Sequence, residues 1–317
     1  MMKNVIIKTI SAVAAVLLIV PVMCSCGKKI GYVPTIGAVE GSLEMVTARY
    51  FEEKSSEYGM YSAASLQDLQ KKLEEQEIDI AFLPINAAAV VYNKTKGAYK
   101  IAAVNTVPEF WLLEAGDSIE TLSDLLHQPV YSCSAERETY YMLQYLQTVN
   151  NTEFGVTYFG GPDKVISGLN DGSIRYAVLC EPYATIAAEK CPNVRKAVNL
   201  GEEWKKCGAP DAIDTVVLIS KNLIYGYKSA VDLFMSEYQE TVGAVNDGTD
   251  DFAKFAVGQG LFENADIASK ALGNCSFVSV TGYDIRKSYS PFMKKLFEIN
   301  NNSFGKKMPD NSIFYEP

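Results

Sequence analysis

The sequence contains few residues that could catalyse a reaction. His127 is the only histidine among the 317 residues, and it falls in a predicted surface turn without a second imidazole to share a metal ion or a proton. Carboxylate pairs such as Glu52-Glu53 and Asp250-Asp251 fall on faces that the surrounding pattern predicts to be solvated. The chain has no Walker loop, zinc-protease helix motif or G-x-S-x-G motif. We therefore expect no catalytic residue, no metal site and no cofactor.

Other residues could bind a small molecule without altering it. Each lies at the end of an apolar run that is typical of a strand, or at the start of the helix that follows. Ligands of open α/β sheets bind outside the carboxyl ends of the strands. The candidate ligand-binding residues are Thr35, Ile36, Gly37, Pro84, Asn86, Thr106, Ser134, Arg137, Gly160, Gly161, Glu181 and Tyr183.

Three of these candidates also have a structural interpretation. Ser134 could bind a polar ligand group at the head of a long helix, or only cap that helix. Asn86 could hydrogen-bond the edge of a heterocycle, or cap the helix after Pro84. Glu181 could contact a ligand amine, or hold its own loop. Both interpretations stay open for each residue.

The charges next to Ser134 bear on the charge of the ligand. Glu136 and Glu138 fall in the first turn of the predicted helix, where carboxylates complement the helix dipole and disfavour a bound anion. Arg137 could offset them. If it does not, nitrate and sulfonates are less favoured than a neutral or aminated ligand.

The N-terminal segment has the pattern of an export signal. Lys3 and Lys8 precede an uncharged apolar stretch, residues 10–23. A membrane-spanning helix needs about 20 apolar residues, so this stretch is too short to span a bilayer and indicates a secretory signal.

Two cysteines compete for the end of that signal. A lipoprotein signal places a small residue directly before the acylated cysteine, and Ser25 precedes Cys26, whereas the bulky Met23 precedes Cys24. We expect residues 1–26 to form a lipoprotein signal and Cys26 to be acylated, which would hold the protein on the extracytoplasmic face of the cell membrane. The alternative is a secreted protein without lipid.

The remaining cysteines do not form a recognisable metal or redox motif. No C-x-x-C pair occurs, and an odd number leaves at least one cysteine unpaired. A bridge between Cys191 and Cys207 is conceivable in an exported protein, but the pattern favours free thiols. These cysteines are Cys133, Cys180, Cys191, Cys207 and Cys275.

The elements that would position the candidates alternate between strand and helix. Strands are predicted at residues 30–33, 58–61, 78–83, 100–107, 110–114, 130–132, 156–159, 177–179 and 215–220, and helices at residues 42–54, 65–75, 122–126, 135–148, 163–169 and 183–190. Everything after residue 220 has a helical pattern, at residues 227–246, 250–257, 265–272 and 283–300. The alternation predicts an α/β fold with mostly parallel sheets.

The order of these elements predicts two lobes that the chain enters discontinuously. Pro108 interrupts two apolar runs and marks a first crossing between lobes. We expect a first lobe from residues 27–107, a second lobe from residues 108–213, and a return to the first lobe with residues 214–317. Such a protein closes by bending near residues 106–108 and 214–215.

Three motifs, in this order, resemble the type II periplasmic binding proteins of the nitrate, sulfonate, taurine and thiamine-precursor class. Residues 77–88, EIDIAFLPINAA, are similar to that class's acidic strand leading into a helix at the ligand cleft. Residues 121–125, TLSDL, resemble the segment that opens the second lobe, and residues 180–184, CEPYA, resemble its E-P-x-x-A turn. The sequence departs from the class at residues 126–129, LHQP, where a Lys-Gly-Lys turn is usual.

The resemblance covers the mature chain and implies a function. It implies a two-lobed type II periplasmic-binding-protein fold, and a monomeric receptor that delivers a small ligand, such as a pyrimidine, a thiamine precursor or a sulfonate-like compound, to the permease of an ABC importer. The alternative is an enzyme on the same fold, of the menaquinone- or thiamine-biosynthesis type. The net charge of −9 and the absence of a basic run argue against nucleic acid as the partner, so we expect none.

Overall fold

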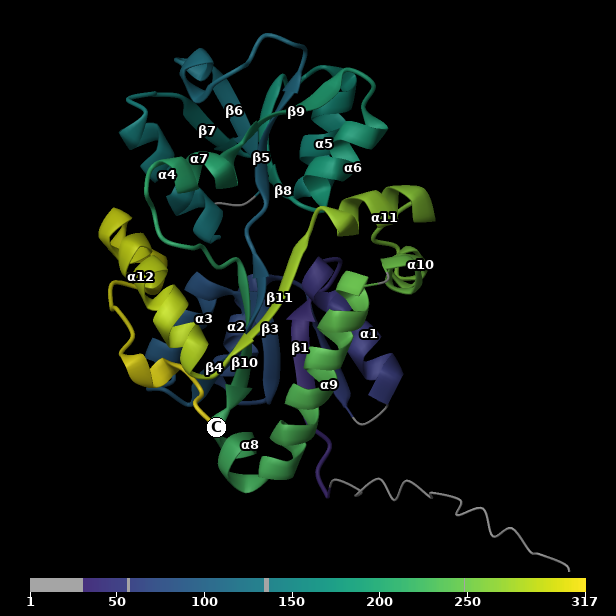
Figure 1. Ribbon diagram of the computed structural model, residues 1–317, viewed down its shortest axis with the longest axis vertical. Coiled ribbons are helices and arrows are strands. Elements are labelled where there is room, and N and C mark those ends of the chain that lie inside the picture. The colour runs from purple at the N-terminus through teal and green to yellow at the C-terminus, as the bar shows by residue number, and fades with distance from the viewer. Residues whose placement is uncertain (1–30, 56–57, 134–136, 248) are drawn as a thin grey trace, which may run out of the picture. The chain divides into compact units, whose positions relative to one another are not determined.

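Two β-sheets with flanking helices make up the described chain (Figure 1). The computed structural model describes residues 31–55, 58–133, 137–247 and 249–317. Residues from Tyr32 to Pro317 form one compact unit. In the described part of the chain, no helix combines the length and the apolar character that crossing a bilayer requires.

The first sheet has six strands in the order β11-β4-β10-β3-β1-β2. Strands β1 to β4 run in one direction, and β10 and β11 pair antiparallel to β4. The register places Gly37 of β1 opposite Tyr61 of β2 and Ala81 of β3. These strands are β1 (Thr35–Val39), β2 (Gly59–Ala63), β3 (Ile80–Pro84), β4 (Tyr99–Val107), β10 (Thr215–Ser220) and β11 (Ser276–Thr281).

The second sheet has five strands in the order β7-β6-β8-β5-β9. Strand β6 pairs parallel to β7 and β8, and β5 pairs antiparallel to β8 and β9. Only residues 108–109 separate β4 of the first sheet from β5 of the second. These strands are β5 (Phe110–Ala115), β6 (Pro129–Ser132), β7 (Gly155–Tyr158), β8 (Tyr176–Cys180) and β9 (Val194–Asn199).

In the part of the chain that the structure describes, twelve helices flank the sheets, in agreement with the predicted α/β class. Their caps follow from sequence: Ser65 accepts a hydrogen bond from the amide of Asp68, and Ser42 from that of Met45. They are α1 (Leu43–Ser55), α2 (Leu66–Glu74), α3 (Ile85–Lys94), α4 (Glu138–Val149), α5 (Pro162–Asp171), α6 (Tyr183–Lys190), α7 (Leu200–Lys206), α8 (Lys221–Gly226), α9 (Lys228–Asp247), α10 (Thr249–Gly258), α11 (Ala265–Gly273) and α12 (Tyr283–Ile299), with 3₁₀ helices at Leu122–Leu125, Asn301–Phe304 and Asn311–Ile313.

The first strand lies later in the chain than the sequence predicted. Residues 30–33 precede it, and Thr35, Ile36 and Gly37 belong to the strand itself instead of the loop after it. Pro34 therefore precedes the strand, where its missing amide costs no ladder hydrogen bond. Gly37 is closely packed, because a Cβ atom there would lie 2.8 Å from Ile78 Cδ1.

Three elements were missed. Strand β11 falls in the region predicted to be helical throughout. Strand β9 and helix α7 lie between residues 191 and 214, where no strand or helix was predicted. Both strands lie at the edges of their sheets, where partly exposed positions weaken the alternation of apolar and polar residues.

Helix α11 forms a further link between the two parts of the fold. It leads into β11 of the first sheet, yet it lies against α6, which packs on the second sheet. Asn274 Nδ2 donates to Thr185 Oγ1 at 2.9 Å, and Lys270 Nζ lies 2.7 Å from Glu189 Oε2. Figure 1 shows α11 and β11 in this position.

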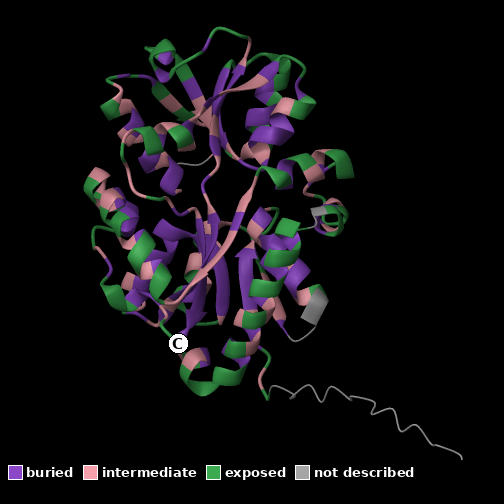
Figure 2. Ribbon diagram, viewed as in Figure 1, coloured by how far each residue is buried: buried purple, intermediate pink, exposed green. Residues whose placement is uncertain are grey.

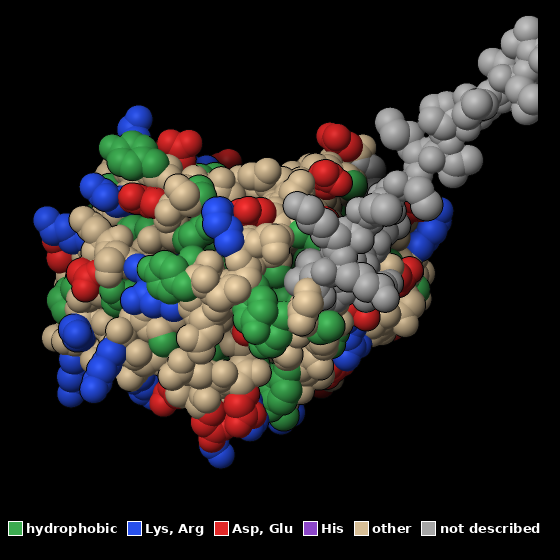
Figure 3. Space-filling model, turned by 90° about the horizontal axis from the view of Figure 1, so that it is seen from below, with side chains coloured by type: hydrophobic (Ala, Val, Ile, Leu, Met, Phe, Trp, Pro, Cys, Tyr) green, Lys and Arg blue, Asp and Glu red, His purple; other side chains and the backbone are tan. Residues whose placement is uncertain are grey.

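The core lies within and directly against the sheets (Figure 2). Every residue of β3 and of β10 is buried, as expected of central strands with helices on both faces. Lys, Arg, Asp and Glu side chains are interspersed over the surface seen in Figure 3, without a large area of one sign. The buried central strands hold the loops at the carboxyl ends of the sheets in place.

Candidate functional site

A cavity of about 600 Å³ lies between the two sheets and is lined by residues from both. One wall consists of the carboxyl end of β1 and the first turn of α1, together with the ends of β3 and β4. The other wall comes from the segments that follow β6 and β8. The lining includes residues 39–46, Phe82, Pro84, Asn105, Thr106, Cys133, Arg137, Pro162, Asp163, residues 180–183, Asp214, Thr215 and residues 259–261.

Arg137 is the main charged group that connects the two walls. It precedes α4 on the second wall, and its Nη1 lies 3.2 Å from Oε1 of Glu44 on α1. Its Nη2 donates to Oδ1 of Asp214, in the segment that returns to the first sheet. Burial lowers the pKa of Arg137, but Asp214 and Glu44 outweigh burial and raise it further above its usual range. The guanidinium therefore stays charged and is held by two carboxylates.

A third carboxyl group, that of Glu138, lies behind this cluster. Its side chain is fully buried, and Oε1 lies 3.9 Å from Nε of Arg137. Neither carboxyl oxygen accepts a hydrogen bond from a residue that the structure describes. Burial, and next the nearby charge of Asp214, raise the pKa of Glu138 well above its usual range. Burial and the charge of Asp214 therefore favour the protonated form of the Glu138 carboxyl group.

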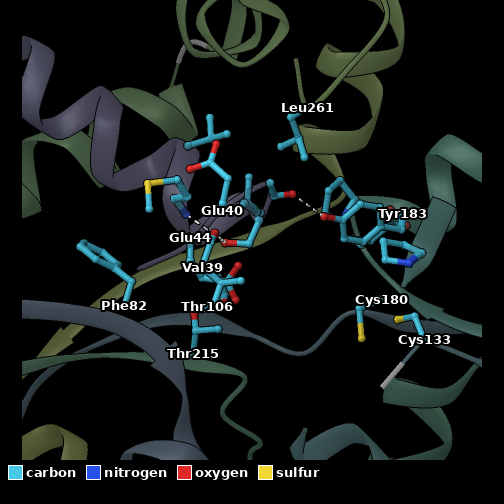
Figure 4. Close-up of a pocket in the computed structure, with 18 of the residues that line it drawn as sticks. Val39, Glu40, Glu44, Phe82, Thr106, Cys133, Cys180, Tyr183, Thr215 and Leu261 are labelled. Atoms are coloured by element: carbon cyan, nitrogen blue, oxygen red, sulfur yellow. Dashed lines mark hydrogen bonds between the residues drawn. The ribbon is translucent and has the colours of Figure 1, made fainter. Parts of the chain in front are cut away.

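A network of polar side chains joins the segments that pass between the sheets. Thr106 Oγ1 lies 2.6 Å from Thr215 Oγ1 and donates to Asp214 Oδ2 at 3.1 Å. Asn105 Nδ2 donates to Thr215 Oγ1 at 3.0 Å, and Tyr238 donates to Asn105 Oδ1 at 3.0 Å. This network holds the carboxylate of Asp214 in the lining of the cavity. Figure 4 shows Thr106 and Thr215 next to each other in that lining.

Tyr183 makes a second contact across the cavity. Its hydroxyl donates to the carbonyl oxygen of Gly41 at 3.1 Å, which joins the start of α6 to the loop after β1 (Figure 4). Burial is the largest cause that raises the pKa of Tyr183, so the hydroxyl stays protonated and can donate. The polar groups of both walls are thus already in contact in this structure.

Two thiols form part of the second wall. Cys133 and Cys180 both line the cavity, and Figure 4 shows their side chains near each other. Burial is the largest cause that raises the pKa of each thiol. Both therefore remain in the weakly nucleophilic thiol form at neutral pH. The five cysteines among the described residues are free, so Cys191 and Cys207 are not bridged.

The structure brings five of the predicted ligand residues to the cavity: Pro84, Thr106, Arg137, Glu181 and Tyr183. Thr35, Ile36 and Gly37 do not line it, because they lie inside β1 and the loop after that strand takes their place. Asn86 is buried in the first turn of α3 and does not line the cavity either.

Gly160 and Gly161 precede α5 and also lie outside the lining, whereas the next two residues, Pro162 and Asp163, contribute to it. Ser134, Glu136 and Cys26 lie outside the described residues. Glu181 accepts a hydrogen bond from the amide of Thr185 at 3.1 Å and pairs with Lys196, so it holds its own loop.

Several important residues were not predicted as ligand residues, above all Glu44 and Asp214. Glu44 lies two residues after Ser42, which caps α1. A serine at the start of a predicted helix marks the carboxyl end of the preceding strand, so this cap could have indicated Glu44 as a candidate. Asp214 was expected only as part of a hinge. Among the described residues, no group of three or more His, Cys, Asp and Glu side chains is arranged to hold a metal ion.

No family model and no curated protein sequence matches the chain. Solved structures do match. An ABC transporter protein from Parabacteroides distasonis is 18% identical with a TM-score of 0.73, over 90% of this chain and 99% of that one. The ligand-binding component of an ABC-type import system from Staphylococcus aureus, with zinc bound, is 16% identical with a TM-score of 0.69, over 90% and 96%.

The periplasmic aliphatic sulphonate binding protein of Escherichia coli is 14% identical with a TM-score of 0.68, over 90% of this chain and 92% of that one. The three likenesses cover nearly the whole of each chain. This chain therefore has the two-lobed fold of periplasmic binding proteins, as its motifs predicted.

Proposed function

We propose that this protein is an extracytoplasmic solute-binding lipoprotein that delivers a small molecule to the permease of an ABC importer. The observation that carries the proposal is the cavity, which receives polar groups from both sheets. A solute that contacts both walls binds the closed form more tightly than the open form, and this difference alone shifts the population toward closure. The permease can then recognise the closed form.

The proposed lobes are residues 27–107 with 214–317, and residues 108–213. They would rotate about residues 106–108 and 214–215, where Thr106, Asp214 and Thr215 form their network. A third segment would also have to bend, because α11 packs on α6 of the second lobe and residues 274–275 connect it to β11 of the first. We propose Pro84, Thr106, Arg137 and Tyr183 as the part of the predicted site that contacts the solute, while Glu181 holds the loop beside it.

An enzyme on this fold is the alternative, and it would need a reactive group in the cavity. The thiols of Cys133 and Cys180 are candidate nucleophiles among the described lining residues, but burial raises the pKa of both and disfavours the reactive thiolate. The sequence pattern of an export signal also favours a receptor, which works outside the cytoplasm. We therefore propose binding without chemical conversion.

Solute binding is expected to stabilise the protein and make it more compact. A solute at 100 times its dissociation constant should add about 2.7 kcal/mol to the free energy of unfolding. A thermal-shift screen of pyrimidines, thiamine precursors, sulfonates, amines and nitrate, followed by small-angle X-ray scattering with each compound that binds, measures both effects. The proposal predicts a smaller radius of gyration with solute, and stabilisation without any change of the scattering curve would contradict lobe closure.

Acylation of Cys26 is expected to be visible by fatty-acid labelling. In a bacterial host fed an alkyne fatty acid, the wild-type protein should carry the label in the membrane fraction. The Cys26→Ser variant should lose the label and leave the membrane, and the matched Cys24→Ser variant should keep both. Labelling that survives in Cys26→Ser, or its absence from the wild-type protein, would contradict the lipid anchor.

A further inference from the structure

We infer from the charges of the cavity that its solute carries a positively charged, amine-type group, which Glu44 and Asp214 bind. This inference rests on the proposed function, because it names the class of solute for the same cavity. It concerns the two carboxylates on either side of the Arg137 guanidinium.

The basic side chains of the cavity are not free to bind an anion. Three of them contribute to the lining in the described part of the chain, and each already has a carboxylate partner. Arg49 Nη2 lies 2.8 Å from Glu40 Oε2, and Lys190 Nζ lies 3.0 Å from Glu263 Oε1. Arg137 is held by two carboxylates. An anionic solute would have to displace a carboxylate from one of these pairs.

The acidic side chains of the cavity, in contrast, outnumber the basic side chains that pair with them. Glu44 and Asp214 share the single charge of Arg137, which leaves one negative charge without compensation. Asp163, on the opposite wall, forms no ion pair with a described residue. The side chains of Glu44 and Asp214 are only 12% and 14% exposed, so water screens their charge less than it would at the surface.

Glu138 gives independent evidence for the negative field at this point. Its side chain is fully buried next to Arg137, and neither of its oxygens accepts a hydrogen bond from a described residue. Its Oε1 lies 3.9 Å from Nε of Arg137, so a third carboxyl group lies near the guanidinium that Glu44 and Asp214 hold. Burial, and next the charge of Asp214, raise the pKa of Glu138, so this site disfavours a third negative charge. A cationic group beside Asp214 would compensate part of the negative charge that is already there.

The rest of the lining suits an organic cation. Tyr183 and Phe82 contribute aromatic side chains to the cavity, and Figure 4 shows them on opposite sides of Glu44. Aromatic faces attract ammonium groups, most strongly where water is excluded. The carboxylates would hold the charged group, and the aromatic and thiol-containing walls would contact the apolar part of the solute.

Two matched series of probes test the inference. Tyramine, tyrosol and 4-hydroxyphenylacetate share a skeleton and differ in charge, as do putrescine, 1,4-butanediol and succinate. We expect the melting temperature of the purified protein to rise most with the amine of a series and least with the acid. Isothermal titration then gives the dissociation constants, with each probe raised to millimolar concentration.

Variants connect the preference to the two carboxylates. Glu44→Gln and Asp214→Asn should each weaken amine binding by about tenfold or more. Asp214→Asn should also improve binding of the acid, because it removes one of the two carboxylates that hold Arg137. The matched Glu298→Gln variant, an exposed carboxylate on α12, should behave like the wild-type protein. The inference would be overturned if the acid bound more tightly than the amine, or if Glu298→Gln lost as much amine affinity as the two cavity variants. It would also be overturned if no amine raised the melting temperature. A captured anionic solute would overturn it while leaving the receptor function intact.

Discussion

Replacing Arg137 with methionine is expected to lower the free energy of unfolding by about 3 to 5 kcal/mol. Methionine keeps much of the length of the side chain but removes the charge that holds Glu44 and Asp214 together. Breaking a buried ion pair from one side leaves uncompensated carboxylates in a place that water reaches poorly. Urea denaturation at pH 7 measures the loss.

The controls for this prediction use the same residue types. Arg286 pairs with Glu316 at the surface, with both side chains more than two-fifths exposed, so Arg286→Met should change stability by no more than about 0.5 kcal/mol. Adding Asp214→Asn to Arg137→Met removes one of the orphaned charges and should recover part of the loss. If Arg137→Met were as stable as Arg286→Met, the cluster would not join the walls of the cavity.

Glu114 is expected to contribute about 3 kcal/mol to stability at neutral pH. Its carboxylate lies on β5 and is fully buried in the second sheet. Burial would raise its pKa, but hydrogen bonds from the hydroxyl and amide of Ser118, the amide of Ile119 and the guanidinium of Arg195 outweigh burial and lower it to about 2. Glu114→Gln should lose this contribution, because an amide nitrogen would face groups that also donate.

The contribution of Glu114 to stability should fall as the pH is lowered. Because the pKa of folded Glu114 lies below the ordinary value of 4.5, its contribution is complete above about pH 4.5 and disappears as the pH falls toward 2. The stability difference between the wild-type protein and Glu114→Gln should therefore shrink over that range. The exposed Glu298→Gln should show no such difference. A difference that stays constant down to pH 2.5 would contradict the assigned role of the carboxylate.

Central elements could be predicted from the sequence because their patterns are strong. The apolar run of residues 215–220 is observed as β10 at the predicted residues, and α6 also has the predicted bounds. Both are surrounded by other elements, so burial dictates which residues they contain. The order of the elements then indicated two sheets and a cavity at the carboxyl ends of their strands.

Edge elements could not be predicted in the same way. Strand β11 contains several partly exposed residues, and Arg195 and Lys196 lie within β9. Strand β1 was placed too early because Tyr32 and Val33 have strong strand propensity. The structure instead uses the smaller residues Gly37 and Ala38 in β1, where Gly37 packs closely against Ile78. Because of that error, Thr35, Ile36 and Gly37 were predicted as ligand residues although they do not line the cavity.

The cluster of Glu44, Arg137 and Asp214 could not be predicted from the sequence for a different reason. Arg137 lies 93 residues from Glu44 and 77 residues from Asp214 in the chain, so no local spacing connects them. The sequence did place Arg137 and Glu138 together and posed the question of the ligand's charge. Only the fold shows that the guanidinium is occupied by two carboxylates from other segments.

Native mass spectrometry of the purified protein, after exposure to a bacterial metabolite extract and removal of unbound compounds, tests the central claim most directly. The account predicts one non-covalent small-molecule adduct per chain, whose mass stays the same on prolonged incubation. A Thr106→Trp variant, which fills the base of the cavity, should retain none. The absence of any adduct from the wild-type protein, or conversion of the retained compound into a product of different mass, would contradict a receptor that binds its solute unchanged.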